Sequence, residues 1–408
     1  MFSICTLLLA LSGSALADPN PPSPAVYAFF YSWYGTPEQD GAWQHWDHSV
    51  LEHWTPSIRA QYPGAATRFL PPHDIHAPFY PASGPYSSRN ASHLRQQLRE
   101  LRAAGVTAIV ASWWGRAGVS AGDSQGVLTG DAVALALEAA AAVGGIGVAL
   151  HLEPYQGRSA ESLAADLAHL AAAYGAHPGL HRSGGGRPVF FVYDSYHLPP
   201  AEWRRLLAPG GDLSVRGGPA DGVFLGLWLE AGHGEELRAG GFEGGYTYFA
   251  ADGFSHGSTV ARWPALAAEA ARLGLLFVPS VGPGYDDTRI RPWNSHNTRP
   301  REGGAYYARM WRAALAVAPG AVSITSANEW GEGTQIEPAV PRAIDVDALA
   351  PRGLALPHAT REALRLRLRD RYEDYGEGGA DLYMRLTRGF AEELRAGARP
   401  AQPPHPDL

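Results

Sequence analysis

The sequence lacks the material for several common kinds of protein. Its only cysteine is Cys5, so a disulfide framework or a thiolate nucleophile is excluded from the rest of the chain. It has no excess of positive charge, because 33 Lys and Arg face 40 Asp and Glu, a net charge of −7. That balance argues against nucleic acid or an anionic membrane surface as a partner. No apolar run has the ~20 residues that a membrane-spanning helix needs. A chain of 408 residues without disulfides must depend on its core, and its 45% hydrophobic residues supply one.

The N-terminus has the features of a targeting segment. Ile4–Leu11 is a short apolar stretch, and Ala15–Ala17 is a cleavage site of the A-x-A type, although no Lys or Arg precedes them. We therefore predict that residues 1–17 are a cleaved secretory signal peptide, with an uncleaved signal-anchor as the alternative. A proline-rich lead-in follows at 18–25. The expected location is the secretory pathway (Golgi lumen, or secreted or periplasmic), with no stable membrane span after cleavage. The oligomeric state is not predicted.

Short apolar runs alternate with helical patterns along the chain. Eight runs are predicted as buried strands: Val26–Tyr31, Val106–Trp113, Ile146–Leu152, Val189–Tyr193, Gly222–Trp228, Gly245–Phe249, Leu275–Ser280 and Ala321–Thr325. Eight segments are predicted as helices: His93–Ala104, Asp131–Val143, Ala160–Tyr174, Pro200–Leu207, Gly234–Ala239, Arg262–Leu273, Gly304–Val317 and Asp381–Ala396. Eight strand–helix repeats predict an α/β fold, a single-domain (β/α)8 TIM barrel.

We place this barrel at residues 26–396, with an insertion at 338–372 and a disordered tail at 397–408. No glycine-rich nucleotide motif follows any strand, which argues against a nucleotide-binding sheet.

The segment from Asn328 to Glu337, N-E-W-G-E-G-T-Q-I-E, follows the last predicted strand. Glu329 and Glu332 lie three residues apart on either side of Trp330. A turn at the end of a barrel strand can direct both acids into one cavity. Two acids beside an indole suit the cleavage of an acetal, since one can move the proton of the leaving oxygen while the other supports the reacting centre.

Other polar and aromatic side chains also follow strand ends, where barrel enzymes place their active sites. The candidate ligand contacts among them are Tyr31, Tyr34, Trp46, Trp114, His151, Glu153, Tyr155, Asp194, Tyr248, Arg291, Trp293 and Asn294. Large aromatics are abundant, with 12 Trp and 18 Tyr, and aromatic rings pack well on the C–H faces of sugars. Such a ring of side chains predicts a carbohydrate cleft.

Each feature also has a purely structural interpretation. Glu329 and Glu332 could be partners of arginines such as Arg291 in an ion-pair network. Glu153 could cap a helix or pair with a nearby arginine, and Asp194 could only hold its loop. Trp33 and Trp113 are expected to be partly core, whereas Trp114 is the better cleft residue because side chains alternate along a strand.

A second chemistry is also possible from the residues alone. His45, Asp47 and His48 resemble a metal cluster, although no third well-spaced imidazole completes it. They leave open a metal-dependent hydrolase, and loss of the acids' function would leave a sugar-binding protein of the same fold.

Several motifs, taken in order, resemble glycoside hydrolase family 99, the endo-α-1,2-mannosidases and endo-α-1,2-mannanases. The matching stretches are F-Y-S-W-Y-G, D-G-A-W-Q-H-W-D-H, G-P-Y-S-S-R, H-L-E-P-Y, F-V-Y-D-S-Y, G-G-Y-T-Y-F-A, P-S-V-G-P-G-Y, R-P-W-N and N-E-W-G-E-G-T-Q-I-E. The resemblance covers nearly everything from Tyr27 to Glu337 and resumes near Tyr372–Thr387.

The resemblance implies a (β/α)8 barrel, no metal or other cofactor, and cleavage within an oligosaccharide or glycoprotein glycan with retention of configuration. It implies that the substrate's own 2-hydroxyl attacks, giving a 1,2-anhydro sugar. Glu329 would take the proton of that hydroxyl, and Glu332 would protonate the leaving oxygen and then activate water. Tyr31 or Tyr34, Glu153, Tyr248, Arg291 and Asn294 would contact the substrate.

Two positions bear on this resemblance. Gly331 stands where many members of the family have histidine. Trp114 stands where the resemblance associates tyrosine with animal Golgi enzymes and tryptophan with bacterial mannan-cutting enzymes. Trp114 thus favours mannan-type substrates over glucose-capped N-glycans, whereas Leu51–Trp54 is more similar to the glycan-processing enzymes. The residues leave both substrates open.

Overall fold

The computed structural model describes residues 23–62, 68–343 and 371–397. The predicted signal peptide, most of the lead-in, the interior of the predicted insertion and all but the first residue of the predicted tail therefore lie outside the described residues. Within them, no helix is both long enough and apolar enough to cross a membrane.

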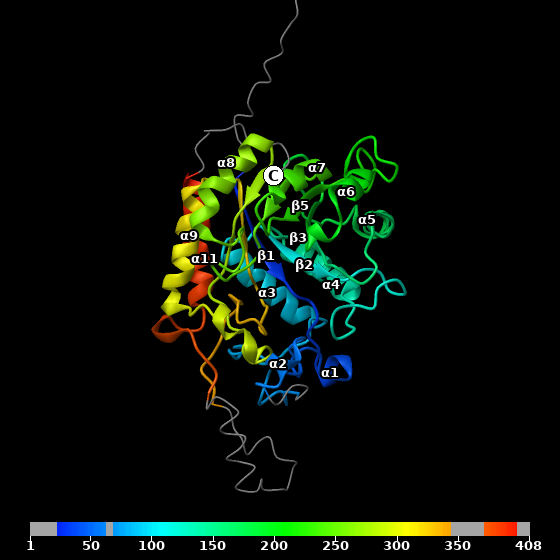
Figure 1. Cartoon of the computed structure of the whole chain (residues 1–408). Coiled ribbons are helices and arrows are strands. Elements are labelled where there is room, and N and C mark those ends of the chain that lie inside the picture. The colour runs from blue at the N-terminus through cyan, green and yellow to red at the C-terminus, as the bar shows by residue number, and fades with distance from the viewer. Residues whose placement is uncertain (1–22, 63–67, 344–370, 398–408) are drawn as a thin grey trace, which may run out of the picture.

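Parallel strands form the centre of the molecule (Figure 1). Their bounds are β1 Ala25–Phe30, β2 Ala108–Trp113, β3 Gly147–Leu152, β4 Val189–Val192, β5 Val223–Leu227, β6 Gly244–Tyr246, β7 Leu276–Val278, β8 Ser280–Val281 and β9 Ala321–Ile324. Every pairing is parallel, in the order β7-β6-β5-β4-β3-β2-β1-β9-β8.

The nine described strands form an eight-stranded barrel, because β7 and β8 occupy one strand position. Pro279 lies between β7 and β8, and proline cannot donate a backbone hydrogen bond, so one continuous segment is divided in two. β7 pairs with β6, β8 pairs with β9, and the carbonyl of Pro279 accepts the N–H of Ser323 at 3.1 Å. The sheet is thereby closed, and the predicted (β/α)8 barrel is confirmed.

Helices surround the strands, with α8, α9 and α11 on one side and α4, α5 and α6 on the other in Figure 1. Their bounds are α1 Pro37–Asp40, α2 Pro56–Arg59, α3 Ala91–Ala103, α4 Gly130–Val143, α5 Ala160–Tyr174, α6 Pro200–Leu207, α7 His233–Gly240, α8 Trp263–Leu273, α9 Ala305–Ala316 and α11 Leu382–Gly397. The last helix packs against both α9 and α3, which completes the outer ring.

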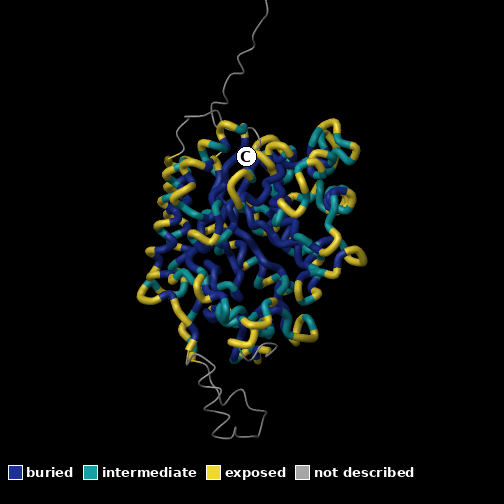
Figure 2. Tube along the Cα trace, in the orientation of Figure 1, coloured by how far each residue is buried: buried dark blue, intermediate teal, exposed yellow. Residues whose placement is uncertain are grey.

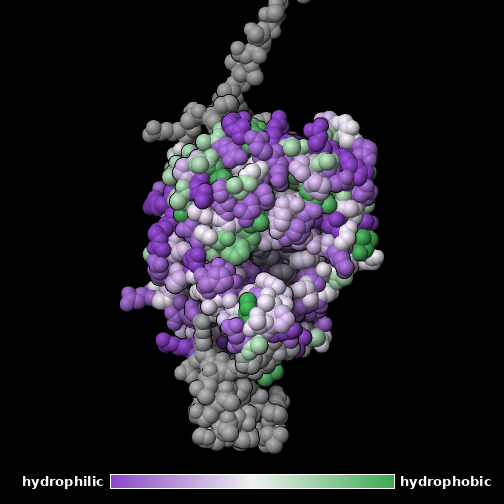
Figure 3. Space-filling model, viewed as in Figure 1, coloured by the Kyte–Doolittle hydropathy of each residue, from purple (hydrophilic) through white to green (hydrophobic). Residues whose placement is uncertain are grey.

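The strands are buried along almost their whole length, as the dark centre of Figure 2 shows. A strand covered by helices outside and by core side chains inside must be apolar on both faces. This is why the strands are continuous apolar runs in the sequence. The face of the molecule shown in Figure 3 is by contrast mostly hydrophilic.

The predicted elements differ from the structure mainly at their ends. The sixth strand stops at Tyr246 instead of reaching Phe249, because Tyr248 has a left-handed backbone with φ of +56°. α3 starts two residues earlier than predicted, since the side chain of Asn90 accepts the N–H groups of Ser92 and His93. The short helices α1 and α2 were not predicted.

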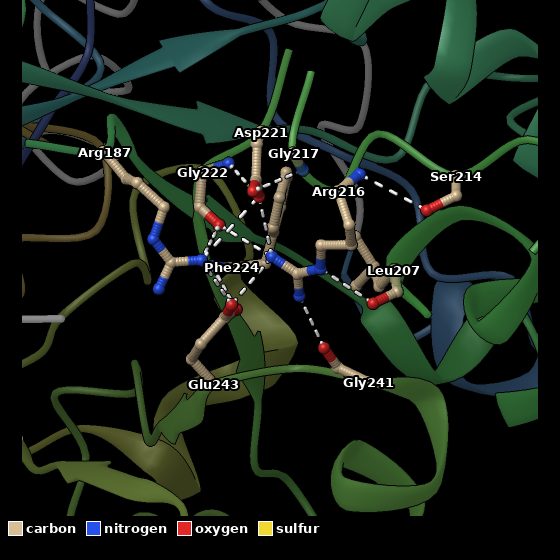
Figure 4. Close-up of polar contacts among 10 residues, drawn as sticks. All are labelled: Arg187, Leu207, Ser214, Arg216, Gly217, Asp221, Gly222, Phe224, Gly241 and Glu243. Carbon is tan, nitrogen blue, oxygen red and sulfur yellow. Dashed lines mark hydrogen bonds and ion pairs between the residues drawn. The ribbon is translucent and has the colours of Figure 1, made fainter. Parts of the chain in front are cut away.

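An ionic network joins the residues that precede β4, β5 and β6, at the amino-terminal end of the barrel (Figure 4). The Nη1 atom of Arg216 lies 2.7 Å from Glu243 and 3.0 Å from Asp221, and Arg187 lies 3.0 Å from Glu243. Arg216 also donates to the carbonyls of Leu207 and Gly241. These contacts join the starts of neighbouring strands at the end opposite the loops that follow the strands.

Candidate active site

A tight turn after β9 carries the two acids. The hydroxyl of Ser326 accepts the N–H of Glu329 at 2.7 Å, and the N–H of Ser326 donates to the carbonyl of Thr334 at 2.9 Å. Gly333 has φ of +61°, and a Cβ there would lie 3.0 Å from the carbonyl oxygen of Asp286, so the turn requires glycine. The sequence of the turn therefore fixes where the acids lie.

Glu329 is the more enclosed acid, with 7% of its surface exposed. Its Oε1 atom accepts the N–H of Gly331 at 3.2 Å. Its Oε2 atom is buried and has no hydrogen-bond partner among the described residues. A buried carboxylate oxygen without a donor is costly, so this atom is suited to receive a donor from a ligand.

Glu332 is more open, with a side chain that is 25% exposed. Its Oε1 atom lies 3.2 Å from Nη1 of Arg291, whose side chain is 30% exposed. The same Nη1 atom lies 3.1 Å from Asp287, which is fully buried. The ion pair between Arg291 and Glu332 that the structural interpretation predicts therefore exists, but both of its side chains keep some exposed surface.

The two carboxyl groups influence each other electrostatically. Burial raises the pKa of Glu329 well above its usual value, and the charge of Glu332 raises it further. Burial also raises the pKa of Glu332, whereas Arg291 lowers it. Because both pKa values are raised and the two surroundings differ, the pair favours a state in which one carboxyl group is protonated and the other is ionised. General acid–base catalysis requires such a state.

The first strand supports the turn from one side. Tyr34 donates its hydroxyl to the carbonyl of Asn328 at 2.9 Å and accepts the N–H of Trp330 at 3.1 Å. The side chain of Asn328 accepts the N–H of Tyr31 at 2.7 Å and donates to its carbonyl at 2.9 Å. These bonds couple the end of β1 to the backbone on both sides of Glu329.

A buried carboxyl group supports the turn from below. Glu337 accepts hydrogen bonds from the hydroxyl of Tyr86 at 2.8 Å, from the indole of Trp330 at 3.0 Å and from the amide of Gln97. Burial raises the pKa of Glu337 to about 7. The motif thus contains a third acid, placed beneath the pair instead of beside it.

On the other side of the barrel mouth, Glu153 is 4% exposed and accepts the hydroxyl of Ser112 at 2.8 Å. His151 lies beside it, with Nδ1 at 3.1 Å from Glu153 and Nε2 at 2.9 Å from the hydroxyl of Tyr246. The hydroxyls of Tyr31 and Tyr248 bond each other. Glu153 raises the pKa of Glu329, although by less than burial, so it belongs to the same electrostatic site.

Four predicted ligand contacts are committed to protein partners. Tyr34 and Trp46 have no exposed surface, and Trp46 stacks on Tyr34 at 4.3 Å. The hydroxyl of Tyr155 lies within hydrogen-bond distance of Asp166 and Ser162, and the amide of Asn294 donates to Asp287 at 3.0 Å. Tyr34 and Trp46 are thus fully buried and pack beneath the acids, and their contact with a ligand stays a prediction.

Other predicted contacts keep some exposed surface. Trp114, Asp194, Arg291 and Trp293 are each half-buried, whereas Trp113 is core with 2% exposed. Trp113 therefore belongs to the core and Trp114 is more exposed, as the alternation of side chains along a strand predicts. Contact with a ligand stays a prediction for all four half-buried residues.

The suspected metal cluster is not assembled in the structure. His45 lies 2.7 Å from Asp123, Asp47 lies 2.6 Å from Arg68, and the Nδ1 of His48 lies 2.6 Å from the carbonyl of Ser49. Among the described residues, no three His, Cys, Asp or Glu side chains form a group that could hold a metal ion.

Sequence reasoning missed two residues of the site. His76 fills the space beside Gly331, since a Cβ on Gly331 would lie 2.8 Å from the His76 ring and 3.2 Å from Glu329. Asp287 holds Arg291 in place beside Glu332. A histidine before a proline-rich loop and an aspartate in D-D-T-R carry no local signal, so only the folded chain identifies them.

The chain is similar to known proteins of one family. The model of glycosyl hydrolase family 99 matches residues 23–350. A Mus musculus protein named glycoprotein endo-alpha-1,2-mannosidase-like protein is 42% identical over 391 residues, which cover 94% of this chain and 80% of that protein. The glycoprotein endo-alpha-1,2-mannosidase of Rattus norvegicus is 43% identical over 382 residues, 93% of this chain and 76% of that protein.

A solved structure is similar over nearly the whole fold. The GH99 endo-alpha-mannosidase of Bacteroides thetaiotaomicron superposes with a TM-score of 0.77 at 37% identity, covering 91% of this chain and 98% of that one.

Proposed function

Since this chain belongs to glycosyl hydrolase family 99 and is a glycoside hydrolase, we propose that it cleaves internal α-1,2-mannosidic bonds of a glycan with Glu329 and Glu332. The relatives' names support the bond that is cut. The observation that carries the residue assignment is the pair of acids in one turn. Glu329 has a buried oxygen without a partner in the described part of the chain, and Glu332 has an arginine partner.

The proposed reaction has two balanced steps. In the first, Glu329 takes the proton of the mannose 2-hydroxyl, the 2-oxygen forms a bond to C1, and the C1–O bond to the leaving sugar breaks as Glu332 protonates that oxygen. In the second, Glu332 takes a proton from water, the water oxygen bonds to C1, and the 2-oxygen leaves C1 and recovers its proton from Glu329. This path differs from the usual retaining pair, in which a carboxylate forms a covalent ester.

The protonation of the site requires one adjustment before the first step. In this structure burial favours the proton on Glu329, and Arg291 favours the ionised form of Glu332. The mechanism needs the reverse. A 2-hydroxyl that donates to Oε2 of Glu329 would stabilise its carboxylate, and a glycosidic oxygen near Glu332 would accept the proton there. Substrate binding is therefore proposed to move one proton within the pair.

The test of the acids is cleavage of an α-1,2-linked mannotetraose by Glu329→Gln and Glu332→Gln. Each should retain binding and lose roughly a hundred- to ten-thousandfold in kcat, since each removes a proton-transfer group. Glu302→Gln is the matched control, because Glu302 is exposed and paired with Arg309 outside the site. Wild-type turnover by either site variant would refute its role.

The substrate is proposed to be an α-mannan or a high-mannose N-glycan, met in the secretory pathway. Half-buried Trp114 presents an indole where a mannose C2 region could pack, which favours release of Man-α-1,3-Man. Product analysis with a yeast-type mannan and a glucose-capped glycan decides between the two. Faster release of Glc-α-1,3-Man would overturn the preference, and Trp114→Tyr should move it in that direction.

A further inference from the structure

Trp54 is the most exposed large apolar side chain among the described residues, at 77%. It lies directly before α2, in the segment that follows β1. An indole so exposed leaves most of its apolar area in water, where it stabilises nothing in the fold. It therefore needs an explanation outside the packing of the chain.

The ring is held in a defined place. His53, which is 8% exposed, stacks on it at 4.0 Å and 27°, and Trp293 meets it edge-on at 5.3 Å and 80°. His53 and Trp293 are perpendicular to each other at 4.7 Å. One face of the indole is thus supported by His53. An aromatic ring fixed in this way loses little conformational entropy when something packs on it.

The group of His53, Trp54 and Trp293 is tied to the acid site. The indole of Trp293 donates to the carbonyl of Leu51 at 3.4 Å, and the N–H of Leu51 donates to the carbonyl of Ile290 at 2.8 Å. Trp293 lies two residues after Arg291, which pairs with Glu332. The exposed indole is therefore connected, through Trp293, to the segment that carries Arg291, the partner of Glu332.

We propose that Trp54 is a sugar platform in the leaving-group half of the cleft, where a neutral pyranose beyond the sugar next to the cleaved bond packs on the indole. This inference rests on the proposed function. The charges beside the ring fit a neutral ligand, because Glu52 pairs with Arg59 at 2.8 Å. One indole supported by one histidine is also far smaller than a stable protein–protein interface.

The experiment compares two α-1,2-mannosides that are identical on the non-reducing side. One has a single sugar in the leaving-group half and the other has at least three. In Trp54→Ala, kcat/KM for the long substrate should fall roughly tenfold, as for loss of one aromatic anchor, while the short substrate keeps its value. Trp54→Phe should fall in between. Leu70→Ala, which truncates a 51% exposed side chain of the same segment, should change neither value.

Equal losses for both substrates, no loss for either, or the same pattern in Leu70→Ala would overturn the platform. Calorimetric binding of the released leaving-group oligosaccharide to wild type and Trp54→Ala separates this inference from the proposed function, because it needs no turnover. Equal affinity of the two proteins would refute the platform even in an active enzyme. A change in self-association on Trp54→Ala would assign the indole to a contact between copies instead.

Discussion

Replacement of the buried Glu337 by glutamine should change how stability depends on pH. Glu337 is 5% exposed, and its carboxylate accepts from Tyr86, Trp330 and Gln97. Glutamine has the same shape, and its carbonyl can accept from Tyr86 and Trp330. Its amide would face Gln97, whose Oε1 is buried without a partner among the described residues, so a flip of Gln97 would give that amide a carbonyl oxygen to donate to.

The magnitude follows from the pKa. Burial raises the pKa of Glu337 from 4.5 to about 7 in the folded chain. A pKa change of one corresponds to about 1.4 kcal/mol, so ionised Glu337 costs the folded state about 3 kcal/mol relative to the unfolded state. Because the folded pKa is the higher one, the stability contribution is fully present below pH 4.5 and is lost as the pH rises to about 7.

The assay is chemical denaturation of wild type and Glu337→Gln between pH 4 and pH 8. The free energy of unfolding of the variant relative to wild type should rise by about 3 kcal/mol across this range. Glu38→Gln, which changes an exposed acid of α1, should follow wild type in parallel. A Glu337→Gln curve that also runs parallel to wild type would refute the reasoning, because it would mean that the carboxyl titrates alike in both states.

Three further predictions concern other parts of the chain. Arg291→Gln should move both limbs of the pH profile of kcat/KM to higher pH, since Arg291 lowers the pKa of Glu329 and Glu332; an unmoved or downshifted profile contradicts this. Gly331→Ala should lower thermal stability by about 1–3 kcal/mol through overpacking against His76. The double variant with His76→Ala should recover most of that loss, whereas stability losses that simply add would show that the two side chains do not share space. Arg216→Ala should cost about 3 kcal/mol in chemical denaturation and leave kcat/KM at low temperature unchanged, because its ion pairs lie at the opposite end of the barrel; a matching loss of activity would contradict this.

The fold could be predicted because a closed parallel barrel has a strong sequence pattern. Strands buried on both faces become continuous apolar runs, and eight of them alternate with helical segments. The residues at which the strands end depend on tertiary contacts, which the apolar pattern of the sequence does not show. Tyr248 leaves the sheet because its N–H bonds the hydroxyl of Ser280 at 2.6 Å, and the sequence shows only another β-forming residue.

The position of the two acids could be predicted because they lie close together in the sequence. Two acids around one indole are a local signal, and the structure places them in one turn with a shared electrostatic environment. The full burial of Tyr34 and Trp46 could not be predicted, because the sequence of a loop does not reveal which of its aromatic residues fold beneath it. His76 could not be identified from the sequence, because most of the barrel separates it from Gly331 along the chain and the two residues meet only in the folded structure.

The most direct test of the account is a proton NMR time course of an α-1,2-linked mannotetraose with the wild-type enzyme. We expect an internal cut whose first product is the α-anomer, which then mutarotates, and product formation slowed at least about a hundredfold when glutamine replaces the acid at position 332. A β-anomer formed first, release of single mannose units from the chain end, or wild-type turnover by that variant would contradict it.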